Sequence, residues 1–168
     1  SYDGTNYHGW QFQPNAITVQ EEISKSLAKI LNLPEVKTMG CGRTDAGVHA
    51  SQFFLHFDLL KDVDLNKLTF ILNKIIDPAI VVKRIFEVSP ESHTRFSATS
   101  RRYHYYFGKK RSPFDRLFVN YNWKDLDVAK MQEACSILFE YKDFTSFSKA
   151  QTQTATNDCT IMDARWID

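Results

Sequence analysis

Apolar residues recur at helical spacing in three segments of the chain. After Thr18, apolar positions follow one another every three or four residues up to Leu31, and Pro34 prevents the helix from continuing. The threonine, with a glutamate three residues later, forms a capping-box signal for a helix start. Similar stripes cover residues 65–76 and 128–141. The pattern predicts three amphipathic helices, each with its apolar side packed in a core.

Runs rich in β-branched and aromatic residues lie between these helices and after the last of them, as is typical of strands. Several runs alternate apolar and polar positions, which suits a sheet with one covered face, whereas Val81 and Val82 indicate a more deeply buried strand. The order of elements predicts an α+β fold with a mixed, mostly antiparallel sheet flanked by helices. The expected strands are residues 53–57, 80–88, 103–107 and 160–166.

Both ends of the chain interrupt this pattern. Tyr2-Asp3-Gly4 is a turn signal that normally follows a strand, and the chain stops at Ile167-Asp168 inside a strand-like run. We therefore expect a fragment of a longer protein.

The composition, with 43% apolar and 24% charged residues in 168, is that of a folded domain. No stretch approaches the roughly 18 apolar residues of a membrane span and no apolar leader opens the chain, so we expect a soluble, cytoplasmic protein. Three widely separated cysteines favour a reducing compartment over a disulfide framework. The cysteines and histidines are also too scattered for a zinc site, so we expect no metal.

The net charge of +1 predicts no partner, but its distribution is informative. From Ser92 to Phe114 the chain has no acidic residue, and basic side chains are interleaved with aromatic ones. This pattern suits a nucleic acid strand, because cations meet phosphates and flat rings meet bases. An exposed strand with a solvated charged face is the alternative interpretation.

The stretch CGRTDAGVHA, residues 41–50, places Asp45 among glycines in a predicted loop. A carboxylate in such a loop can act as a nucleophile, and Arg43 could pair with it and keep it ionised. Local rules alone favour a turn in which Asp45 bonds its own backbone, because aspartate is common in turns. A glycosidase-like pair of carboxylates is a weaker alternative. The nearest acids downstream are Asp58, Asp62 and Asp64.

Four sequence blocks decide between these interpretations, because they occur in the order and at the spacing of one known family. The chain resembles the TruA family of tRNA pseudouridine synthases along essentially its whole length. The blocks are YDGTNYHGWQ at 2–11, GRTDAGVHA at 42–50, RFSATSRRYHY at 95–105 and DFTSF at 143–147.

The resemblance implies a role for individual residues. Asp45 corresponds to the catalytic nucleophile, and Arg43 to the arginine that pairs with it and assists base flipping. Tyr103 corresponds to the tyrosine that stacks on the target base, while Arg101 and Arg102 are similar to residues that contact the RNA backbone. Whether the aspartate attacks the ribose or the uracil, and whether the tyrosine is a base or only stacks, stays open. His49 is expected to be a structural member of the loop.

The implied fold is the pseudouridine synthase fold, two similar halves around a continuous antiparallel sheet. Residues 1–88 would form the N-terminal, catalytic-loop half, and residues 89–168 the start of a second half that lacks the family's C-terminal block. Cys159 stands where many members carry an arginine. The implied activity is isomerisation of uridine at tRNA positions 38–40, in the anticodon stem-loop, by a homodimer that needs no cofactor.

Two other classes of function predict different behaviour. An RNA-binding module without activity shares the basic and aromatic segment but does not need Asp45. A glycoside hydrolase would release sugar and have no affinity for RNA.

Overall fold

The computed structural model describes residues 1–59, 61–121, 126–148 and 156–167, and Asp168, the last residue of the expected closing strand pattern, lies outside them. The described residues contain three α-helices, two short 3₁₀-helices and two two-stranded sheets, so the predicted α+β class is confirmed. Within them no helix is long and apolar enough to cross a membrane.

The chain divides into two compact units. Unit 1 consists of Ser1–Tyr106 with Ser112–Val119, and unit 2 consists of Phe107–Arg111 with Asn120–Asp168. Every candidate site residue named above lies in unit 1.

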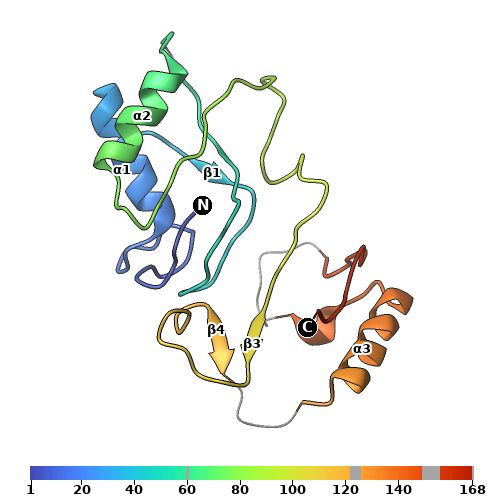
Figure 1. Ribbon diagram of the computed structural model, residues 1–168. Helices are drawn as coiled ribbons and strands as arrows, with labels where there is room; N and C mark the ends of the chain where they lie inside the picture. Colours follow the sequence, from blue (N-terminus) through green and yellow to red (C-terminus); the bar gives the residue numbers. More distant parts are fainter. Residues whose placement is uncertain (60, 122–125, 149–155, 168) are drawn as a thin grey trace. The chain divides into compact units, whose positions relative to one another are not determined.

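Helices α1 and α2 confirm two of the predicted helices. Helix α1, Val19–Leu31, begins where the side chain of Thr18 accepts a hydrogen bond from a backbone N–H three residues later. It ends at Asn32, which adopts a left-handed φ of 52°. Helix α2, Leu65–Ile75, has Asp64 in the same capping role. The two helices lie side by side in Figure 1.

The core of unit 1 joins the apolar sides of these helices to the aromatic residues near the start of the chain. The Trp10 ring packs against Phe53 with ring centroids 4.2 Å apart, and Gly40 leaves room for it, since a Cβ there would lie 2.4 Å from the indole nitrogen. Burial of this apolar surface fixes the first ten residues against the rest of the unit. The buried apolar residues are Tyr2, Tyr7, Trp10, Val19, Ile23, Leu27, Val36, Leu68, Leu72, Ile76 and Ile80.

The observed strands are short. Strand β1, Met39–Gly40, pairs antiparallel with β2, Leu55–His56, so only the centre of the predicted strand 53–57 is confirmed. Strand β3, Tyr106–Gly108, pairs with β4, Val119–Tyr121, and overlaps only the end of the predicted strand 103–107. The long connection between β1 and β2 carries the residues of CGRTDAGVHA.

The expected strands at 80–88 and 160–166 are wrong. Within 80–88 only Ile80 forms a β-bridge, and residues 160–166, all of them described, form no strand. The deep burial expected at Val81 and Val82 is also wrong, since Val81 is 49% exposed and Val82 is half-buried. The backbone of Val82 bonds the side-chain amide of Asn73 instead of a neighbouring strand. Apolar alternation marks the faces of a strand but does not supply its hydrogen-bonding partner.

Helix α3 is shorter and less buried than predicted. It spans Val128–Ile137 and continues as a 3₁₀-helix over Leu138–Glu140, and a second 3₁₀-helix covers Thr145–Phe147. The expected packing of its apolar stripe in a core is wrong, because no residue of the helix is buried. An amphipathic stripe is buried only where a second apolar surface meets it. Met131, Cys135 and Leu138 are half-buried, and Val128 and Phe139 are exposed.

Truncation of Leu72 tests the packing of α2 against α1. Leu72 is 1% exposed and Ile75, on the same helix, is 41% exposed. We expect Leu72→Ala to lower the free energy of unfolding by about 2–5 kcal/mol, because it leaves a cavity. The control Ile75→Ala should cost roughly 1 kcal/mol or less. Urea unfolding followed by circular dichroism measures both, and equal losses would contradict this packing.

Candidate functional site

The candidate site is formed by two segments of unit 1. We call residues 2–10 the opening segment and residues 41–49 the motif loop. Tyr2, at the start of the opening segment, forms a β-bridge with Ala50, the residue after the motif loop. The Tyr2 N–H donates to the Ala50 carbonyl at 2.8 Å, and the Ala50 N–H donates to the Tyr2 carbonyl at 3.0 Å. The start of the chain therefore lies against the end of the motif loop.

The opening segment holds the backbone on both sides of Asp45. The Trp10 N–H donates to the carbonyl of Thr44 at 3.2 Å, and the Gly47 N–H donates to the carbonyl of Tyr7 at 3.1 Å. The Asp45 side chain itself is exposed. The structure thus combines a fixed backbone with a carboxylate that a large substrate can reach.

Two glycines of the opening segment permit this close approach. A Cβ at Gly4 would lie 2.1 Å from the carbonyl oxygen of Val48, and a Cβ at Gly9 would lie 2.2 Å from that of Thr44. Both distances are far below van der Waals contact, and Gly9 also has a positive φ of 85°. Gly47 has a φ of 77° but nothing within 4 Å of its Cβ position. The glycines at 4 and 9 are therefore required by backbone contact with the motif loop.

Two buried tyrosines of the opening segment, Tyr2 and Tyr7, lie at its contact with the motif loop. The Tyr2 hydroxyl lies 2.9 Å from the hydroxyl of Thr44, the residue before Asp45. Burial is the main cause that raises the pKa of Tyr2. Burial, followed by the charges of nearby acids, raises the pKa of Tyr7 to about 12. Both phenols are thus neutral at physiological pH, and Tyr2 acts on the loop as a hydrogen-bonding group.

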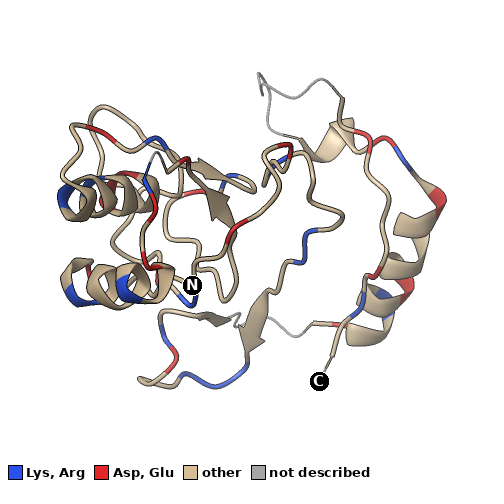
Figure 2. Cartoon of the chain, turned by 90° about the horizontal axis from the view of Figure 1, so that it is seen from above, with Lys and Arg blue, Asp and Glu red and all other residues tan. Residues whose placement is uncertain are grey.

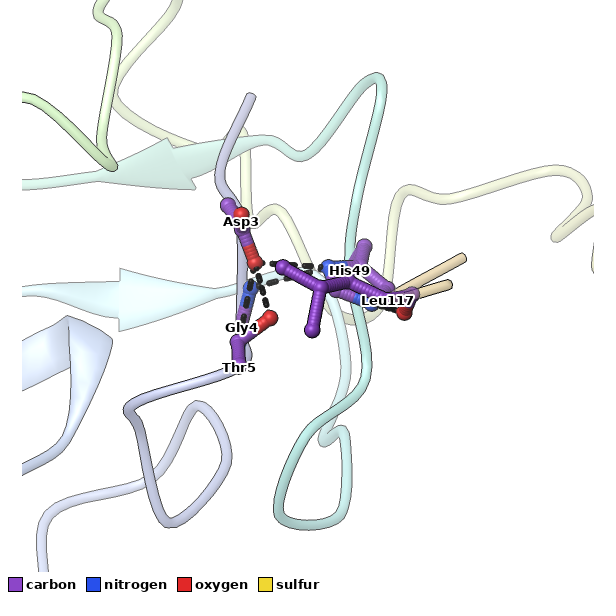
Figure 3. Close-up of polar contacts among 5 residues, drawn as sticks. All are labelled: Asp3, Gly4, Thr5, His49 and Leu117. Atoms are coloured by element: carbon purple, nitrogen blue, oxygen red, sulfur yellow. Dashed lines mark hydrogen bonds and ion pairs between the residues drawn. The ribbon is translucent and has the colours of Figure 1, made fainter. Parts of the chain in front are cut away.

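His49 joins the end of the motif loop to two other segments of unit 1 (Figure 3). Its Nδ1 lies 3.2 Å from the backbone nitrogen of Gly4 and 3.0 Å from Oδ1 of Asp3, and its Nε2 lies 2.9 Å from the carbonyl oxygen of Leu117. A neutral imidazole accepts from Gly4 and donates to Leu117, whereas a protonated one donates to Asp3. The ring also packs on Phe118 with centroids 4.6 Å apart. In either state hydrogen bonds of His49 join the motif loop to the other two segments.

Asp3 is held by its own turn as well as by the histidine. Its Oδ1 accepts from the backbone N–H of Thr5 at 3.0 Å and from the Thr5 hydroxyl at 2.6 Å. The hydroxyl bond, then the backbone bond, lower the pKa of Asp3, and His49 adds to the effect. The carboxylate is therefore charged at neutral pH and available to the imidazole.

Of the remaining candidate residues, Arg43 lies in the motif loop itself, and Arg101, Arg102 and Tyr103 are consecutive in the basic segment. Arg43 and Arg102 are exposed, and Tyr103 is 65% exposed. Among the described residues no hydrogen bond, ion pair or ring contact joins Tyr103 to Asp45. Arg101 does reach the loop, since Nε and Nη2 of its guanidinium donate to the carbonyl of Cys41 at 3.2 and 2.7 Å. Figure 2 shows basic residues along the extended chain before β3 and in the connection between β3 and β4.

Local sequence rules do not identify all the residues that position the motif loop. Those rules do not reveal that Tyr2, Gly4 and Gly9 position the motif loop, because the contacts join residues some forty positions apart. The only local signal is a run of aromatic residues and glycines that has neither helical nor strand periodicity.

The chemistry that the site offers is that of an exposed carboxylate on a restrained loop. Such a group can attack an electrophilic carbon, and neighbouring arginines can bind an anionic substrate. Within the described part of the chain, no group of three or more histidine, cysteine or acidic side chains is arranged to hold a metal ion.

Several curated proteins are similar to this chain along almost its whole length. No family model matches the chain. It is 47% identical over 166 residues to tRNA pseudouridine synthase A of Bacteroides thetaiotaomicron, covering 99% of the chain and 61% of that protein. It is 46% identical over 167 residues to the Bacteroides fragilis protein of that name, covering 99% and 66%. For the Porphyromonas gingivalis protein the identity is 43% over 169 residues, covering 99% and 67%. The chain thus spans 61–67% of the length of these curated relatives.

A pair of glycine substitutions tests the backbone contact beside Asp45. Gly9→Ala and Gly47→Ala both place a side chain at a positive φ, which costs about 1–2 kcal/mol. Only Gly9→Ala also drives a methyl group into the Thr44 carbonyl. We expect Gly9→Ala to lower the free energy of unfolding by at least about 3 kcal/mol, and Gly47→Ala by about 1–2 kcal/mol. Urea unfolding gives both values, and equal destabilisation would refute a steric role for Gly9.

Proposed function

This chain belongs to the tRNA pseudouridine synthase A family, and from that membership we propose that the complete protein isomerises uridine to pseudouridine in tRNA. The observation that carries the proposal is the exposed carboxylate of Asp45, on a loop whose backbone is bonded on both sides of it. Asp45 does open a turn, since its carbonyl accepts from the Val48 N–H at 3.2 Å, and the bonds from a distant segment on both sides of it support a further role.

Asp45 is the nucleophile of the proposed reaction. The bond between N1 of uracil and C1′ of ribose breaks, the detached uracil turns, and a bond between C5 and C1′ forms. C5 loses its proton and N1 gains one, so the product is an isomer of the substrate and no redox equivalent is consumed. The carboxylate attacks either the ribose or the uracil ring and is released at the end.

The target uridine must leave its stack before the carboxylate can reach it. Unstacking costs a few kcal/mol, which stacking on an aromatic side chain can repay. We assign this stacking to Tyr103, whose ring is largely exposed, and we assign to Arg43 the pairing with Asp45 and the assistance to base flipping. Arg102, which is also exposed, contacts the RNA backbone.

The substrate region and assembly follow the resemblance described above. We propose the anticodon stem-loop of tRNA as the substrate, a homodimer as the working form, and the cytoplasm as the compartment. The proposed whole has the pseudouridine synthase fold, with residues 1–88 in the catalytic-loop half and residues 89–168 in the second half. Recognition of RNA by shape and phosphates suits an enzyme that acts on several neighbouring uridines.

Substitution of Asp45 tests the proposed chemistry. In the full-length protein we expect Asp45→Asn to reduce pseudouridine formation in an anticodon stem-loop RNA by at least about 1,000-fold, because an amide is a poor nucleophile. Folding and RNA affinity should remain, since the side chain is exposed. Chemical labelling of pseudouridine measures product, and a filter-binding assay measures affinity.

The exposed Asp62 provides the matched control. Asp62→Asn should retain full activity, whereas a large loss there would favour a pair of carboxylates. A normal rate for Asp45→Asn would exclude the nucleophile assignment. RNA binding without product in the unsubstituted protein would identify an inactive RNA-binding module.

Substitution of Tyr103 separates stacking from proton transfer. Tyr103→Ala should weaken RNA binding by about 1–3 kcal/mol, because a stacking surface is lost, whereas Tyr103→Phe should bind normally. Equal weakening by both substitutions would contradict stacking. The single-turnover rate of Tyr103→Phe then decides the second role, since loss of a general base lowers the rate by roughly 100-fold or more.

A further inference from the structure

Two adjacent arginines of the basic segment differ in what their side chains touch. The resemblance gives Arg101 and Arg102 the same task, contact with the RNA backbone. We propose instead that Arg101 is a positioning residue, which holds the start of the motif loop so that Asp45 is correctly placed. The inference rests on the proposed role of Asp45 as nucleophile.

The guanidinium of Arg101 is already hydrogen-bonded to two backbone carbonyls. Its Nε and Nη2 both donate to the carbonyl of Cys41, at 3.2 and 2.7 Å, and Nη2 also donates to the carbonyl of Arg95 at 3.0 Å. Hydrogen bonds from a charged donor are about twice as strong as neutral ones, and the planar fork fixes their direction. These bonds take three of the five N–H donors that a guanidinium has.

Cys41 is a suitable point from which to fix the motif loop. Its N–H donates to the carbonyl of Phe54 at 2.9 Å, so the residue is bonded to the chain beside β2 on one side and to Arg101 on the other. The next residue is Gly42, whose backbone is intrinsically free to rotate. A Cβ at Gly42 would lie 3.5 Å from Nε of Arg101, so the arginine packs directly over this position.

The segment that carries Arg101 is itself attached to β1. The Thr94 hydroxyl donates to the carbonyl of Met39 at 3.0 Å and lies 2.9 Å from Nδ1 of His56, on β2. Arg101 therefore extends from a segment that is fixed on the β1–β2 pair. The motif loop is held by Arg101 at Cys41 and by the opening segment at Thr44 and Gly47.

Arg102 shows none of these contacts. Both arginines are exposed, but within the described part of the chain the Arg102 side chain has no hydrogen bond or ion pair. Its charge is therefore available to a phosphate, as the resemblance implies. The two neighbours thus provide a test in which one substitution should affect the reaction and the other should affect binding.

The experiment compares Arg101→Lys with Arg102→Gln in the full-length protein, with an anticodon stem-loop RNA. Lysine keeps the charge of Arg101 but cannot reproduce the fork. We expect Arg101→Lys to lower the single-turnover rate at saturating RNA by about tenfold or more, since small misplacements of a reacting group cost up to ~100-fold. Its RNA affinity and the salt dependence of that affinity should be unchanged.

Arg102→Gln should instead weaken RNA binding and reduce the slope of log affinity against log salt by about 0.7–0.9, the value for one lost phosphate contact. The exposed Lys37 gives a control for loss of a positive charge outside the motif loop and the basic segment, and Lys37→Gln should change neither quantity. A normal single-turnover rate in Arg101→Lys would overturn the inference. A salt slope reduced by Arg101→Gln as much as by Arg102→Gln would also overturn it.

Two further measurements separate positioning from a loss of folding and from failure of the proposed reaction. The unfolding midpoint of Arg101→Lys should equal that of the unsubstituted protein. In the unsubstituted protein the Nε–H of Arg101, which donates to the Cys41 carbonyl, should exchange hydrogen more slowly than the Nε–H of Arg102. Should the unsubstituted protein form no pseudouridine, the proposed function fails, and this comparison still decides whether Arg101 is bonded to the loop. Equal exchange at the two Nε–H groups would refute the restraint.

Discussion

The close contact between the backbones of the opening segment and the motif loop determines where Asp45 lies. It requires Gly4 and Gly9, because a Cβ at either position would overlap a carbonyl oxygen of the loop. Hydrogen bonds across the contact then fix Thr44 and Gly47, one residue before and two residues after the aspartate. Aromatic residues of the opening segment lie in the core, so the contact is anchored by the packing of the whole unit.

The motif loop combines a restrained backbone with an exposed side chain at Asp45. The backbone is held from three directions, by the opening segment, by the His49 crosslink and by Arg101, while the Asp45 carboxylate remains exposed. In the proposed role of nucleophile, a carboxylate placed in this way needs little reorganisation when the substrate arrives, which is how proximity and orientation lower a barrier.

The sequence predicted those features that depend on neighbouring residues. Thr18 and the apolar stripe after it located α1, because capping and helical periodicity are local. The strand expected at 80–88 failed because its pairing depends on distant residues, and the Asn73 side chain bonds Val82 instead. For Asp45, local rules favoured a simple turn, and only the four spaced blocks indicated chemistry. The contacts of Tyr2 and Gly9 with Thr44 could not be predicted, because they arise only in the folded unit.

Native-state amide hydrogen exchange in the full-length protein tests most directly whether the opening segment restrains the motif loop. The Trp10 and Gly47 amides donate across the contact on either side of Asp45. If the contact opens as a unit, both amides should be protected with the same opening free energy, and Gly9→Ala should lower both together. Rapid exchange at either amide in the unsubstituted protein, or protection that Gly9→Ala leaves intact, would contradict this restraint.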